Sequence, residues 1–229
     1  MRILLTGTRS FGVAVYRRLE GIGGVDIPVV VAPPGDKLAT IAASEPHTES
    51  GVPRHEITPD LVADHGIDLI VAAHSHAFVG QRSRKAARLG AIGYHPSLLP
   101  RHRGKDAVRW TIHMGDPVAG GSVYWFTNSV DCGPIQIQDF CLVRPGWDHH
   151  DLWQEELFPM GVRLLESAVR QILSGYVIQI DQDPKVATWE PSWERPPVHR
   201  PELIELGDGS GHAFEIQKGR WPGHPVGMM

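Results

Sequence analysis

The chain has 229 residues, of which 41% are hydrophobic and 21% charged, a composition typical of one globular domain with room for a short appendage. Its formal net charge is −4, and this lack of a basic excess argues against nucleic acid as a partner. No run approaches the ~18 apolar residues that a membrane-spanning helix needs, so we predict no membrane association.

The amino-terminal stretch and the cysteines indicate a cytoplasmic, reduced protein. The opening MRILLTG is shorter than a signal peptide and lacks its cleavage-site pattern. Cys132 and Cys141 form no CxxC pair, and nothing in the sequence indicates an oxidising compartment in which they would be bridged.

Short apolar runs alternate with helical patterns in the first half of the chain. Residues 2–6, 27–32 and 67–73 are rich in Leu, Ile and Val, as buried strands are. Residues 11–20 and 80–89 place apolar side chains at helical spacing. This alternation predicts an α/β fold with a doubly wound, mostly parallel sheet.

The second half has a different pattern. Residues 121–127 and 134–143 are expected to be two extended segments joined by a turn, after a helix over about 105–114. Residues 149–174 have the apolar spacing of one long amphipathic helix. From about residue 190 the chain is rich in Pro, Gly, Trp and His, which form a core poorly, so residues 191–229 are expected to be an appendage.

Two features would mislead if taken alone. The turn GTRSFG after the first strand has neither the GxGxxG of a dinucleotide fold nor the Lys of a phosphate-binding loop. Thirteen histidines suggest a metal, but there is no HExxH and no Cys/His cluster with zinc spacing. The closest histidine pairs are His74/His76 and His149/His150. We predict neither a bound nucleotide nor a metal.

One stretch has the arrangement of a catalytic loop. Residues 90–104, GAIGYHPSLLPRHRG, lead an apolar strand into His95, where open α/β sheets place their chemistry. Pro96 and Pro100 stiffen the loop that follows. Asp131 lies in a later turn and could fix the tautomer of the imidazole for acid–base work. Spacing alone, however, favours an ordinary loop histidine and an ordinary turn aspartate.

The motifs YHPSLLPRHRG and VDCGPI resemble the signature of the folate-dependent formyltransferase superfamily. Within it, WTIHMGD, SVYWF and ATWEP make the hydrolase domain of 10-formyltetrahydrofolate dehydrogenase the most similar. The resemblance implies a Rossmann-like sheet and a catalytic domain over residues 1–190. It also implies 10-formyltetrahydrofolate as cosubstrate, without a metal. It gives no support to residues 191–229.

The resemblance makes His95 and Asp131 the catalytic pair, matching the His of the family's Asn-x-His motif and its later Asp. The sequence departs from the motif at Gly93, which stands where the family has Asn. That Asn donates a hydrogen bond to the formyl oxygen as it becomes an oxyanion, and losing one such donor typically costs ~3 kcal/mol of transition-state stabilisation. We therefore expect Gly93→Asn to raise the rate if the site has room.

Further binding residues follow from the resemblance, and each could equally be part of the core or of a loop. The pterin is expected between the 73–79 segment and the Asp131 turn, against Phe78, Leu89, Leu99, Cys132 and Gly133. The substrate loop is expected to use Ser97 and Arg103, and the acceptor to lie near Arg9 and Ser10.

Three functions remain open. The first is formyl transfer to the amine of a small molecule, the second is hydrolysis of 10-formyltetrahydrofolate with water as acceptor, and the third is folate binding with little catalysis because of Gly93. Methionyl-tRNA formyl transfer is disfavoured, because the last 35 or so residues are not notably basic. Trp189, Trp193 and Trp221 make a homodimer plausible.

Overall fold

The computed structural model describes residues 1–44 and 56–193. Met1–Glu190 forms one compact unit and Pro191–Met229 a second one, of which only the first three residues are described. The expectations for residues 194–229, including Trp221, therefore lie outside the described residues. No described helix is long and apolar enough to cross a membrane.

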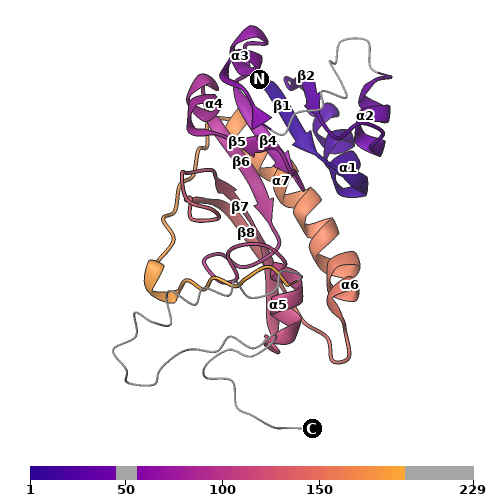
Figure 1. The fold of residues 1–229 in the computed structure, drawn as a ribbon, viewed down its shortest axis with the longest axis vertical. Helices are drawn as coiled ribbons and strands as arrows, with labels where there is room; N and C mark the ends of the chain where they lie inside the picture. Colours follow the sequence, from indigo (N-terminus) through magenta and orange to yellow (C-terminus); the bar gives the residue numbers. More distant parts are fainter. Residues whose placement is uncertain (45–55, 194–229) are drawn as a thin grey trace, which may run out of the picture. The chain divides into compact units, whose positions relative to one another are not determined.

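A six-stranded sheet with the strand order β2-β1-β4-β6-β7-β8 forms the centre of the first unit (Figure 1). The first four strands of that order pair in parallel, and β6, β7 and β8 pair antiparallel. The mostly parallel α/β sheet is confirmed. Its strands are β1 (Arg2–Gly7), β2 (Asp26–Val31), β4 (Leu69–Ala73), β6 (Gly90–His95), β7 (Val118–Trp125) and β8 (Ile135–Leu142).

Helices cover both faces of the sheet. Successive residues of β1 and β4 alternate between two hydrophobic clusters, as the two-residue period of a strand requires. Ile3 and Val71 pack with α1, α2 and α7, whereas Leu4 and Ile70 pack with α3. The helices are α1 (Arg9–Glu20), α2 (Lys37–Ala42), α3 (Pro59–Asp64), α4 (Gln81–Ala86), α5 (Ala107–His113), α6 (His149–Leu152) and α7 (Phe158–Leu173).

Three local features differ from the sequence-based expectations. A small parallel sheet joins β3 (Glu56–Ile57) to β5 (Phe78–Val79), and both strands are too short to give a periodic signal. The helix expected over 80–89 ends at Ala86. The helix expected over 149–174 is interrupted by a π-helical turn, Trp153–Leu157, next to Pro159, which supplies no backbone donor.

Tyr94 anchors β6 just before the strand ends at His95. Its ring lies against Gly121 of β7 and Gly161 of α7. A Cβ atom on either glycine would lie 2.4 Å from the ring. Its hydroxyl donates to the carbonyl of Leu157, 2.8 Å away. Two glycines and one hydrogen bond thus position the end of the strand that carries the predicted catalytic histidine.

Candidate active site

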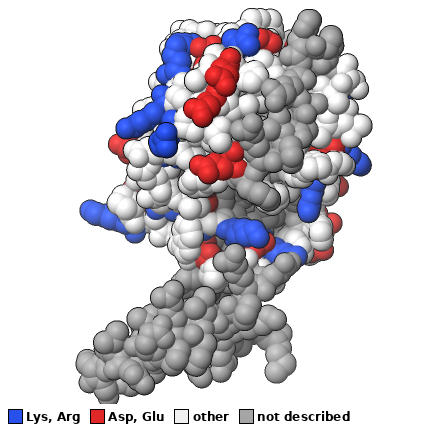
Figure 2. Space-filling view, turned by 45° about the horizontal axis from the view of Figure 1, so that its top comes forward, with Lys and Arg blue, Asp and Glu red and all other residues white. Residues whose placement is uncertain are grey.

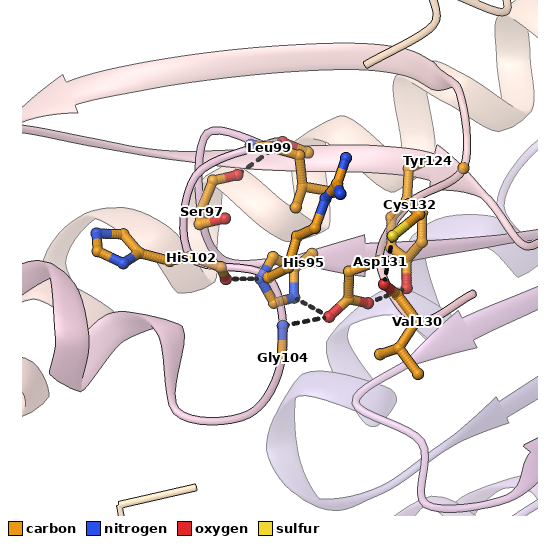
Figure 3. Close-up of polar contacts among 12 residues, drawn as sticks. His95, Ser97, Leu99, His102, Gly104, Tyr124, Val130, Asp131 and Cys132 are labelled. Atoms are coloured by element: carbon orange, nitrogen blue, oxygen red, sulfur yellow. Dashed lines mark hydrogen bonds and ion pairs between the residues drawn. The ribbon is translucent and has the colours of Figure 1, made fainter. Parts of the chain in front are cut away.

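His95 lies at the carboxyl end of β6, and only 7% of it is exposed. Its Nε2 is 2.7 Å from the backbone oxygen of His102. Because a carbonyl oxygen only accepts, Nε2 carries a hydrogen and donates it. The other ring nitrogen, Nδ1, faces Asp131 Oδ2 at 3.6 Å (Figure 3). Of the two ring nitrogens, Nδ1 is therefore the one that can accept a proton.

Asp131 is buried, and two donors fix its carboxylate. The backbone N–H of Gly104 donates to Oδ2 at 2.7 Å, and the hydroxyl of Tyr124 donates to Oδ1 at 2.6 Å. Burial, reinforced by the charge of Asp131, raises the pKa of Tyr124 well above its usual value of 10. Tyr124 consequently stays protonated and remains a donor at neutral pH. The sequence predicts Asp131 at the site but gives no signal for Tyr124.

The side chain of Gln182 stabilises the turn that carries Asp131. The Gln182 side-chain amide donates to the carbonyls of Asp131 and Gly133, at 2.9 and 2.7 Å. Its oxygen accepts from Arg103 Nε and Nη2, at 3.0 and 2.7 Å. A Cβ atom at position 133 would lie 1.6 Å from the carbonyl oxygen of Trp125, so only glycine fits there.

Ser97, predicted in the substrate loop, and Leu99, predicted beside the pterin, are both buried. The Ser97 hydroxyl donates to the carbonyl of Arg101 at 2.6 Å, which closes the loop on itself. Leu99 packs with Tyr124 and Ile135 in a small apolar cluster beside the site. Both contacts stabilise the shape of the loop.

The space beside Gly93 is filled by an aromatic ring. A Cβ atom at position 93 would lie 2.5 and 2.7 Å from Cε1 and Cζ of Phe126. The backbone of Phe126 is fixed beside β6, because its N–H donates to the carbonyl of Ala91 at 2.8 Å. The room required for a faster Gly93→Asn variant is thus absent unless the ring moves. Position 93 also carries no side-chain donor toward His95.

Arg84 joins the two segments between which the pterin is expected. One guanidinium nitrogen donates to the carbonyl of Val79 and another to the side chain of Asn128, both at 2.6 Å. Cys132 is half-buried in the second segment, and its thiol donates to the carbonyl of Val130 at 3.0 Å. The 73–79 segment and the Asp131 turn are therefore neighbours.

The remaining predicted residues are not all at this edge of the sheet. Phe78 is 65% exposed in β5, beside the predicted pterin position. Arg9 and Ser10 are exposed at the start of α1, directly after β1. Leu89, by contrast, precedes the first residue of β6 and so lies at the opposite end of that strand from His95. It packs against the core of the α1/α7 face, which removes it from the site.

The histidine pair His74 and His76, for which the sequence predicts no metal, follows β4 at the same edge. The rings of His74 and His76 are 5.6 Å apart, and the Thr8 hydroxyl donates to the carbonyl of His74 at 2.8 Å. Loss of solvent, with the nearby charges of His76 and Arg9, lowers the pKa of His74. Among the described residues, no group of three or more metal-binding side chains occurs.

Comparison with known proteins places this geometry in a family. The model of the formyl transferase family matches residues 3–164. Human cytosolic 10-formyltetrahydrofolate dehydrogenase is 34% identical in an alignment of 202 residues that covers 83% of this chain and 22% of the human protein. The chain thus spans about a fifth of the length of these dehydrogenases. A methionyl-tRNA formyltransferase from Nitratidesulfovibrio vulgaris is 28% identical over 82% of this chain and 61% of its own.

Solved structures agree on the fold. Phosphoribosylglycinamide formyltransferase from Bacillus halodurans has a TM-score of 0.65 at 19% identity, covering 76% of this chain and 96% of its own. An N-formyltransferase from Helicobacter canadensis, solved with folinic acid and dTDP-3-aminofucose, has a TM-score of 0.67 at 14% identity, covering 87% and 74%. Together with the match over residues 3–164, the comparisons show that the chain belongs to the formyl transferase family.

Proposed function

We propose that this protein transfers the formyl group of 10-formyltetrahydrofolate to the amine of a small molecule, with His95 and Asp131 as the catalytic pair. The observation that carries the proposal is the facing of His95 Nδ1 and Asp131 Oδ2 at 3.6 Å, both buried at the carboxyl edge of the sheet. Membership of the formyl transferase family supports the cosubstrate.

The pair suits acyl transfer. The amine attacks the formyl carbon on N10 of the folate, a tetrahedral intermediate forms, and the carbon–N10 bond then breaks. His95 uses Nδ1 for proton transfer, since Nε2 is engaged by the His102 carbonyl. It takes a proton from the attacking amine and returns one to N10 as N10 leaves. Asp131, whose Oδ2 faces Nδ1, stabilises the imidazolium that forms in between.

The oxyanion of the intermediate needs a donor other than a side chain at position 93. Gly93 has none, and the ring of Phe126 occupies the adjacent space. We assign this role to His95 in its protonated form, with Nδ1–H as donor. Losing a dedicated donor typically lowers the rate by about 10²–10³-fold, so we expect slower turnover than in relatives that retain the Asn.

The surroundings of the site support a small-molecule acceptor. Arg9, Ser10, His74 and His76 are exposed at the carboxyl ends of β1 and β4, which share an edge with β6. An amine acceptor would find polar groups to bind there. Hydrolysis needs no such groups, because its acceptor is water. On the face drawn in Figure 2, basic and acidic side chains are interspersed, without the basic stripe that RNA binding favours.

Hydrolysis is the second candidate. It is favoured by the 34% identity to 10-formyltetrahydrofolate dehydrogenase, whose hydrolase domain the motifs around His95 resemble. The same pair would then activate water, and formate would be released with tetrahydrofolate.

The deciding experiment is to mix the protein with 10-formyltetrahydrofolate without an amine and follow tetrahydrofolate by absorbance. Transfer predicts slow release that a matching amine accelerates, found by screening amino sugars and other small amines. Fast release without any amine would replace transfer by hydrolysis. Binding of the folate, seen as a rise in Tm, with no release under any condition would contradict both and leave a folate-binding protein. His95→Ala is the control, and retained activity in it would refute the catalytic role of His95.

A further inference from the structure

His102 holds the catalytic ring through its backbone, not its side chain. Its carbonyl accepts from His95 Nε2, while its own ring points away from His95 (Figure 3). The backbone of His102 has φ 55°, in the left-handed region that is uncommon for residues other than glycine. The contacts around His102 hold it in this conformation.

The side chain of His102, which is 2% exposed, contacts one carboxylate at each ring nitrogen. Nδ1 lies 2.9 Å from Glu190 Oε1, and Nε2 lies 2.8 Å from Asp116 Oδ2. Arg101 completes the cluster with two hydrogen bonds to Asp116, each 2.6 Å. Burial raises the pKa of Asp116, but the hydrogen bonds from Arg101 and His102 outweigh it and lower the pKa below its usual value.

Glu190 comes from a segment beyond residues 3–164, the part that matches the family model. There the chain runs parallel to the catalytic loop, with a bridge between Arg103 and Trp189. The N–H of His102 donates to the Thr188 hydroxyl at 2.8 Å. This segment therefore reaches the backbone of the loop as well as the His102 ring.

The burial of Glu190 is unfavourable for the stability of the fold. Glu190 is 3% exposed, and its Oε2 is buried with no hydrogen-bond partner among the described residues. A half-satisfied buried carboxylate is unfavourable for folding. Strain and unsatisfied groups of this kind concentrate at functional sites.

We propose that Glu190 and Asp116 are positioning residues, which hold the His102 ring so that the His102 carbonyl keeps His95 in the Nε2–H tautomer with Nδ1 facing Asp131. Because it concerns how His95 works as a catalytic residue, this proposal rests on the proposed function. Neither carboxylate touches the reacting atoms. Both act through the orientation of one carbonyl group.

The test is Glu190→Gln, which keeps the shape of the side chain and removes its charge. We expect kcat to fall about ten- to hundredfold, because misplacing a catalytic group by about 1 Å can cost 10²-fold. KM for 10-formyltetrahydrofolate should stay within about twofold, since Glu190 is 3% exposed and is proposed to act only through His102. Glu155→Gln is the matched control, because Glu155 is exposed in the π-helical turn.

A second measurement does not depend on turnover. In protein labelled with ¹⁵N-histidine, with His95→Ala used to assign the signals, His95 should show the Nε2–H tautomer in the wild type and a mixture in Glu190→Gln. An unchanged tautomer and unchanged kcat in the folded variant would overturn the proposal, as would a rise in KM alone. If the wild type does not turn over the folate, the proposed function fails and the histidine spectra still decide. If Glu190→Gln does not fold, Asp116→Asn poses the same question at the other nitrogen.

Discussion

At position 93 the backbone of β6 passes so close to the Phe126 ring that the ring limits which side chain position 93 can carry. A Cβ atom there would overlap the far end of the ring, at 2.5 Å from Cε1. The sequence shows the missing Asn at once, because Gly93-Tyr94-His95 can be compared with the motif directly. It does not show what fills the space, because Phe126 is brought there by the pairing of β6 with β7.

The first prediction concerns this pair. Gly93→Asn alone should lower the rate of tetrahydrofolate release, since the new side chain must displace the Phe126 ring and disturb the neighbouring site. Gly93→Asn with Phe126→Ala opens the space and should raise kcat above that of Phe126→Ala by up to about 10²-fold, as an added oxyanion donor would. Single-turnover assays on all three variants measure this. No gain in the double variant would mean that the donor assigned to His95 already supplies all the stabilisation that the oxyanion needs.

Among the elements, β6 and α7 were the easier to predict and their junction the harder. The apolar spacing over 149–174 indicates a helix, but it does not indicate the π-helical turn at Trp153–Leu157, which precedes Pro159. Gly161 likewise has no periodic signature. Its role emerges only when Tyr94, 67 positions earlier in the printed sequence, is packed against it.

The second prediction is made for this junction. Gly161→Ala gains helix propensity worth up to about 1 kcal/mol, but the added methyl would lie 2.4 Å from the Tyr94 ring, which its hydrogen bond to Leu157 restrains. Overpacking of this kind costs about 1–3 kcal/mol, so the free energy of unfolding should fall. Urea denaturation checks this, with Gly23→Ala as control because nothing lies within 4 Å of a Cβ there. A Gly161→Ala protein as stable as Gly23→Ala would show that the ring yields freely.

In the first unit as a whole, what the sequence predicts is local and what it misses is long-range. Strands and helices follow from runs of a few residues, and the resemblance of HPSLLPRHRG supplied His95. The contacts that complete the site join residues far apart in the chain. Glu190 reaches His102 across 88 positions, and Gln182 reaches the Asp131 turn across 51. A single sequence carries no signal for such pairs, because each partner alone is an ordinary polar residue.

The same long-range contacts predict how the protein responds to acid. The pKa of Asp116 is lowered in the folded chain, so its ionised form stabilises the fold at every pH above the unfolded value of about 3.9. That contribution is lost as the pH falls below about 4 and through the lowered folded pKa. Thermal melting between pH 7 and pH 3 should therefore show a steep drop in Tm below pH 4, and the drop should be shallower in Asp116→Asn, which is already less stable at pH 7. Equal slopes for the two proteins would mean that other carboxylates govern acid unfolding and that the Arg101–Asp116–His102 cluster adds little to the stability of the fold.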